Sequence, residues 1–137
     1  MKRTALVVVV VLTALVGIKL RAQQVQTYRS PVVVAHKVGS NCTSNTCGAC
    51  AVCVSVYVTI PKAATVNAIH CLSVVKDKDH DYPHGDLHEV TCGQDILWSI
   101  FEPPTTTVSG DSKIIASTFH NRSSDRDRDA QLTVDWH

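Results

Sequence analysis

Apolar and polar positions alternate along much of this chain with a period of two residues. The stretch VCVSVYVTI, residues 52–60, places valine and isoleucine on one face and cysteine, serine, tyrosine and threonine on the other. The stretch AQLTVDW, residues 130–136, alternates in the same way. A period of two indicates a half-buried β-strand, because successive side chains point to opposite faces of a sheet. Both stretches are therefore predicted to be strands with one face against a core.

Other β-branched and apolar runs, separated by turn residues, predict the remaining strands. They lie at residues 31–38, 65–75, 87–92, 96–101, 105–108 and 113–119. Glycine, proline, aspartate and asparagine cluster between these runs, and no stretch has the spacing of an amphipathic helix. About seven or eight short strands with turn signals at this spacing predict an all-β fold, an antiparallel β-sandwich.

The first residues of the chain predict export. A basic start, Lys2 and Arg3, precedes an uncharged apolar run at residues 5–18, and Ala22 offers a small residue for cleavage. This is the pattern of a signal peptide, here residues 1–22. A membrane anchor through residues 5–18 is the alternative if the segment stays attached, although a spanning helix needs about 20 apolar residues. Residues 23–30 would then be a polar, mobile lead-in, and residues 31–137 a single domain.

Removal of the signal peptide changes the charge of the chain. It takes away four of the 13 Lys and Arg and none of the 12 Asp and Glu, which leaves a net charge of −3. A nucleic-acid-binding domain would carry a basic patch or stripe, so no nucleic-acid partner is expected. We expect a secreted or otherwise extracytoplasmic protein (periplasmic or on the cell surface if bacterial), in a setting where cysteines form disulfides.

The chain has six cysteines, all in the part predicted to be exported. An even number of cysteines in an oxidising compartment favours three disulfides. Six cysteines allow 15 pairings, and the sequence does not choose among them. The disulfide candidates are Cys42, Cys47, Cys50, Cys53, Cys71 and Cys92.

In two other interpretations, the cysteines are metal ligands. The stretch CTSNTCGAC, residues 42–50, followed by Cys71, has the plant-type 2Fe–2S spacing. It is similar to the first cluster motif of the xanthine oxidase family, the molybdenum hydroxylases. The resemblance covers residues 42–71 and implies a 2Fe–2S cluster on Cys42, Cys47, Cys50 and Cys71, with electron transfer as the activity. Structural zinc on paired cysteines is the other interpretation.

Histidines and aspartates gather in DKDHDYPHGDLHE, residues 77–89. Pro83 and Gly85 disfavour a helix, so the stretch is predicted to be a loop. Imidazoles suit zinc and copper, and carboxylates suit calcium. If the loop binds one of these metals, the candidate ligands are His80, His84, His88, Asp79 and Asp81. The alternative is a solvated connection that binds no metal.

A second polar loop, HNRSSDRDRD at residues 120–129, is the other candidate ligand site. Trp98 is expected in the core, with a ligand-stacking surface as the alternative. The ligand-loop candidates are Tyr82, His120, Asn121, Asp125, Asp127 and Asp129.

The motifs of common hydrolases, G-x-S-x-G and H-E-x-x-H, do not occur in the sequence, so we do not expect an enzyme. The sequence predicts a secreted, disulfide-stabilised β-sandwich that binds an extracellular glycan or protein and needs no cofactor. The alternatives are an exported metal-binding or electron-transfer protein, and a structural subunit that assembles with itself through exposed strand edges.

Overall fold

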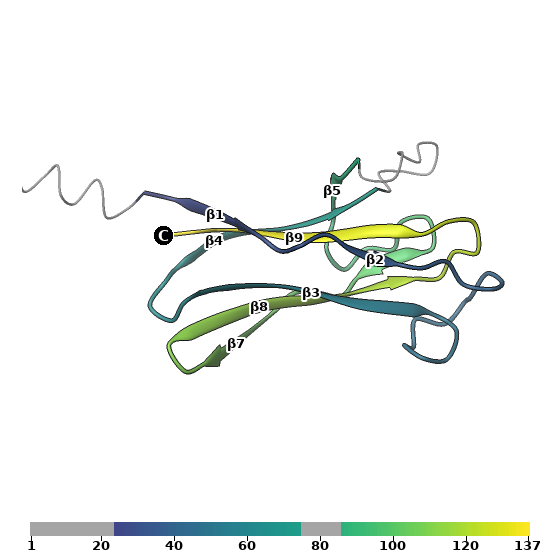
Figure 1. Ribbon diagram of the computed structural model, residues 1–137, viewed down its shortest axis with the longest axis horizontal. Coiled ribbons are helices and arrows are strands. Elements are labelled where there is room, and N and C mark those ends of the chain that lie inside the picture. Colours follow the sequence, from purple (N-terminus) through teal and green to yellow (C-terminus); the bar gives the residue numbers. More distant parts are fainter. Residues whose placement is uncertain (1–23, 75–85) are drawn as a thin grey trace, which may run out of the picture.

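A computed structural model describes residues 24–74 and 86–137, which form two antiparallel sheets packed face to face (Figure 1). The first sheet contains β1 (Gln26–Arg29), β2 (Val33–Ala35), β4 (Val66–Ser73), β5 (His88–Val90) and β9 (Arg128–Trp136). The second contains β3 (Val52–Pro61), β6 (Ser99–Phe101), β7 (Thr105–Ser109) and β8 (Ser112–Asn121). The described residues are all-β, as the sequence predicts, with nine strands instead of the expected seven or eight.

Each sheet is organised around one long strand. β9 pairs with β4 on one side, and on the other side with β1 and β2, which occupy successive parts of its length. β8 pairs with β3 on one side, and with β7 and then β6 on the other. The register of β3 on β8 runs from Val52 opposite Asn121 to Pro61 opposite Ser112.

The core lies between the two sheets and follows the predicted alternation. On β9, Leu132 and Val134 have no exposed surface, and on β3 the side chains of Val56, Val58 and Ile60 are buried while their neighbours are exposed. The rings of Phe101 and Phe119 pack with centroids 4.6 Å apart within this core. The confirmed alternation therefore fixes which face of each strand meets the other sheet.

One strand was not foreseen by the pattern. The sequence predicts a mobile lead-in at residues 23–30, whereas Gln26–Arg29 forms β1, with all four residues exposed. Backbone pairing holds this edge strand, with Gln26 opposite Trp136, together with an edge-on contact between the rings of Tyr28 and Trp136. The predicted signal peptide lies outside the described residues. Within residues 24–74 and 86–137, no helix has the length and apolarity of a membrane span.

All six cysteines are paired. Cys71 on β4 bonds to Cys92, just after β5. The pairs Cys42–Cys50 and Cys47–Cys53 interleave where the chain enters β3, with Cys53 in the strand itself. The prediction of a disulfide-stabilised sandwich is confirmed, and disulfides of this number indicate an oxidising, extracytoplasmic setting.

Candidate functional site

A two-residue turn with unusual backbone geometry precedes β6. Ile96 and Ser99 exchange backbone hydrogen bonds of 2.7 and 3.0 Å across it. The two central residues, Leu97 and Trp98, have φ values of 47° and 66°. Positive φ at both positions is the requirement of a type I′ turn, which Asn-Gly usually satisfies. Here two large L-residues take up that conformation.

Arg122, the first residue after β8, lies beneath this turn. Its backbone N–H donates to the Trp98 carbonyl oxygen at 2.8 Å, and its guanidinium carbon is 5.6 Å from the centre of the Trp98 ring. The guanidinium also forms an ion pair with Asp95. The Arg122 side chain is 9% exposed, and no described residue accepts a hydrogen bond from its Nε. The buried Arg122 guanidinium therefore lies against one face of the Trp98 ring.

These residues line a hollow of about 570 Å³, a volume within the range of small-molecule sites. Trp98 is 40% exposed, so the expectation of a core tryptophan is wrong. The turn carries its ring outward instead of into the sandwich. The lining presents a flat apolar ring, together with a carboxylate and a guanidinium whose charges cancel. The residues that form it are Asp95, Leu97, Trp98 and Arg122.

Part of the predicted ligand loop points into the protein. His120, Asn121 and Asp129 are buried. The side-chain amide of Asn121 donates to the carbonyl oxygen of Ala35 at 3.0 Å, and its Oδ1 accepts from the Ser123 N–H at 3.0 Å. These contacts give Asn121 a structural role in joining β8 to the end of β2.

The two remaining aspartates of that loop are accessible but separate. Asp125 is exposed, and its N–H donates to the hydroxyl of Ser123. Asp127 accepts a hydrogen bond of 2.8 Å from the Lys37 N–H, which lowers the pKa of its carboxyl group below the ordinary 3.8. No described carboxylate joins them in a metal-binding group.

Most of the predicted histidine site lies outside the described residues. This applies to Asp79, His80, Asp81 and His84, and also to Tyr82 of the ligand-loop candidates. His88 is described: it begins β5, is half-buried, and lies 3.4 Å from the carboxylate of Asp86. The metal-site hypothesis for this loop therefore stays a prediction.

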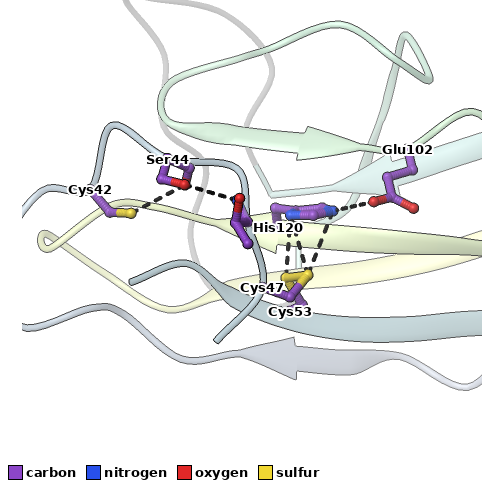
Figure 2. The surroundings of a disulfide bond; sticks show 7 residues. Cys42, Ser44, Cys47, Cys53, Glu102 and His120 are labelled. Carbon is purple, nitrogen blue, oxygen red and sulfur yellow. Dashed lines mark hydrogen bonds and ion pairs between the residues drawn. A yellow bond between two sulfur atoms is a disulfide. The ribbon is translucent and has the colours of Figure 1, made fainter. Parts of the chain in front are cut away.

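A second group of chemically active side chains surrounds the Cys47–Cys53 disulfide (Figure 2). Nδ1 of His120 lies 3.2 Å from Sγ of Cys53 and 3.6 Å from Sγ of Cys47. On the other side of the ring, Nε2 is 2.9 Å from Oε1 of Glu102. The three ligand atoms of Cys47, Cys53 and His120 lie within 4.8 Å of one another, and two of them are bonded together as a disulfide.

The cysteines named by the 2Fe–2S resemblance belong to three different disulfides. Cys42 pairs with Cys50, Cys47 with Cys53, and Cys71 with Cys92. In this state their sulfur atoms are bonded in pairs. The sequence named His120 only as a ligand-loop candidate and did not indicate its place beside the disulfide, because His120 meets Cys53 only through the register of β3 on β8.

Comparisons with protein-family models, with curated proteins and with solved structures find no match to this chain. We therefore argue function from the geometry of its side chains. A fold of this kind hosts many functions, so the hollow at the turn and the cysteine–histidine group are the relevant features.

Proposed function

We propose that this chain is a secreted binding module without catalytic activity, and that the hollow at the Leu97–Trp98 turn binds a neutral glycan. One observation carries the proposal: a strained turn holds Trp98 outward above the buried cation of Arg122. Export is supported by the three disulfides and by the signal-peptide pattern of residues 1–22.

The backbone of the turn favours a functional role. A left-handed conformation costs an ordinary L-residue roughly 1–2 kcal/mol, and glycine or asparagine would remove much of that cost. Strained conformations of this kind concentrate at binding and active sites. Leu97 and Trp98 both carry this strain, and the result is that the tryptophan ring faces the hollow.

The chemistry of the lining matches a sugar better than an ion. The Trp98 ring presents a flat apolar surface against which the C–H face of a pyranose can pack. Asp95 can accept hydrogen bonds from hydroxyl groups, and the Arg122 guanidinium can donate them. Because Asp95 and Arg122 form an ion pair, their charges cancel and favour a neutral ligand.

The size of the site favours a glycan over a protein partner. A stable protein interface buries about 800 Å² on each side and needs no hollow, whereas a small ligand binds in a concave site. The hollow, at about 570 Å³, is of the size that takes one or two sugar rings. A small number of directed polar groups beside one aromatic ring is also the usual composition of a small-ligand site.

The test is a binding screen of the oxidised protein against neutral oligosaccharides of glucose, galactose, mannose and N-acetylglucosamine. Binding is measured by calorimetry and by tryptophan fluorescence, where Trp136 is buried and Trp98 reports the site. We expect Trp98→Ala to weaken binding by about tenfold or more, as removal of a central aromatic contact does.

Tyr57→Ala is the matched control, because Tyr57 is an exposed aromatic residue (58%) in the middle of β3 and does not line the hollow. This variant is expected to bind like the wild type. Binding that is insensitive to Trp98→Ala, or no binding to any member of the panel, would refute the proposal.

A further inference from the structure

The pairing of β3 with β8 places a histidine directly against a disulfide. Cys53 and His120 are cross-strand partners, and Nδ1 of His120 lies 3.2 Å from the Cys53 sulfur. His120 is 3% exposed, and the short distance from its Nδ1 to the Cys53 sulfur is a direct contact. None of these residues lines the hollow of the proposed glycan site.

Glu102 determines where the imidazole carries its proton. A carboxylate only accepts hydrogen bonds, so the Nε2 that lies 2.9 Å from it is the protonated nitrogen. Nδ1 then directs its lone pair at the disulfide, whose sulfur atoms have no proton to donate. A second proton on Nδ1 would give an imidazolium held between the Glu102 carboxylate and a sulfur atom. Such a cation stabilises a thiolate at that sulfur.

The two cysteines of this disulfide differ in exposure. Cys47 is exposed and Cys53 is half-buried. A nucleophile from solvent is therefore expected to attack Cys47, which makes the sulfur of Cys53 the leaving group. Exchange is faster when the leaving thiol forms a stable thiolate. The leaving sulfur here is the one closest to His120.

The neighbouring disulfide has the opposite environment. Its exposed member is Cys50, so its leaving sulfur would be that of Cys42, which is 2% exposed. That sulfur lies 3.2 Å from the carbonyl oxygen of Ser44 (Figure 2). A carbonyl oxygen repels a developing thiolate. In the third disulfide, Cys71 is fully buried.

We propose that Cys47–Cys53 is a thiol–disulfide exchange site, attacked at Cys47 by an external dithiol. The attacking thiolate forms a bond to Sγ of Cys47, and the Cys47–Cys53 bond breaks with its electron pair on Sγ of Cys53. The proton that the attacking thiol gave up is taken by Nδ1 of His120, and the imidazolium N–H formed in this way pairs with the Cys53 thiolate. The second thiolate of the external dithiol then displaces Cys47. The dithiol is oxidised to a disulfide and loses two protons, and Cys47 and Cys53 become two thiols.

Partial reduction of the oxidised protein tests this site. The protein is treated with limiting dithiothreitol in the presence of a metal chelator, quenched, and alkylated with one reagent. The remaining disulfides are then reduced and alkylated with a second reagent. Trypsin releases Val38–Lys62, which carries all four clustered cysteines, and its fragmentation assigns each label. We expect Cys47 and Cys53 to be labelled first, with Cys42–Cys50 and Cys71–Cys92 still intact.

Glu102→Gln separates this role from a structural one. Glu102 is a positioning residue that acts through His120, and the substitution removes its charge with little change in shape. We expect the rate constant for opening Cys47–Cys53 to fall about tenfold, while that of Cys71–Cys92 does not change. A merely structural contact would give the opposite result, because a looser fold exposes every disulfide and speeds its reduction.

His36→Gln is the matched control, since His36 is an exposed histidine that pairs with Asp127 and not with a cysteine. It should leave all three rates unchanged. First opening of Cys42–Cys50 or of Cys71–Cys92, or a Glu102→Gln protein with wild-type rates, would overturn the proposal. The assay uses no glycan, so its outcome is independent of the function proposed for the hollow.

Discussion

His70 and Asp135 join the two central strands of the first sheet, with Nε2 of the imidazole 3.0 Å from Oδ2 of the carboxylate. The other ring nitrogen, Nδ1, lies 2.6 Å from Glu89 on β5. Asp135 in turn accepts a hydrogen bond of 2.7 Å from the Thr27 hydroxyl on β1. The result is a line of polar contacts that crosses four neighbouring strands.

This line of contacts makes stability depend on pH. The hydrogen bonds to Glu89 and then to Asp135 raise the pKa of His70 above its ordinary 6.5. The hydrogen bonds from Thr27 and then from His70 lower the pKa of Asp135 below its ordinary 3.8. The His70 contribution is therefore complete below pH 6.5 and is lost as pH rises through the raised pKa. The Asp135 contribution is complete above pH 3.8 and is lost as pH falls through the lowered pKa.

We therefore expect these contacts to stabilise the fold most between about pH 4 and pH 6.5. The measurement is the urea midpoint of unfolding as a function of pH, for the wild type and for His70→Gln. In His70→Gln, the urea midpoint should no longer decline as the pH rises above this window. Parallel pH profiles for the two proteins would contradict the assignment to His70.

Asn121 is expected to be the most sensitive polar residue of the second sheet. It is fully buried, and its amide group donates to Ala35 and accepts from Ser123. Asn121→Ala leaves these backbone groups without partners and should lower the free energy of unfolding by about 3 kcal/mol. Chemical denaturation measures this, with the exposed Asn45→Ala as the control. A loss below about 1 kcal/mol would show that water replaces the amide.

Cys71–Cys92 should contribute more stability than Cys42–Cys50. The two cysteines are 21 residues apart in the first pair and 8 in the second. A longer loop loses more entropy in the unfolded chain when it is closed, so we expect Cys71→Ala/Cys92→Ala to cost about 3 kcal/mol. Cys42→Ala/Cys50→Ala should cost about 0.8 kcal/mol less, by the same entropy relation. Denaturant unfolding of both double variants measures the two losses of stability. A larger loss for Cys42→Ala/Cys50→Ala than for Cys71→Ala/Cys92→Ala would contradict this expectation.

Position 97 should prefer residues that tolerate a left-handed backbone. Leu97 has a φ of 47°, a conformation that asparagine accepts and that β-branched residues strongly disfavour. Leu97→Val should lower the free energy of unfolding by about 1–2 kcal/mol, and Leu97→Asn should raise it by about 1 kcal/mol because asparagine tolerates the left-handed backbone. If apolar packing dominated at this position instead, valine would be the better tolerated residue. Thermal unfolding of the two variants distinguishes these cases.

The sequence predicts most strands because burial and alternation coincide in them. The alternating run at residues 52–60 became β3, and the run at 130–136 became most of β9. β1 escaped prediction because it has no buried face, and only backbone pairing with β9 marks it as a strand. Pattern reasoning therefore works where the core selects the residues, and fails at an edge that hydrogen bonds alone define.

Neither candidate site could be assembled from sequence. His120 and Cys53 are brought together by the register of two long strands, which no local pattern encodes. The Leu97–Trp98 turn has neither the Asn nor the Gly that usually marks a type I′ turn. Turn preferences therefore did not indicate that the Trp98 ring faces outward. The six cysteines were identified, but their pairing depends on the fold that brings them together.

The interleaving of Cys42–Cys50 with Cys47–Cys53 also bears on how the protein survives proteolysis. A cut at any single peptide bond between residues 42 and 53 leaves at least one disulfide that spans it. The two fragments of a nicked chain therefore stay covalently joined, and β3 stays tethered to the segment before it. Such a nick would be invisible on a non-reducing gel and would appear only after reduction.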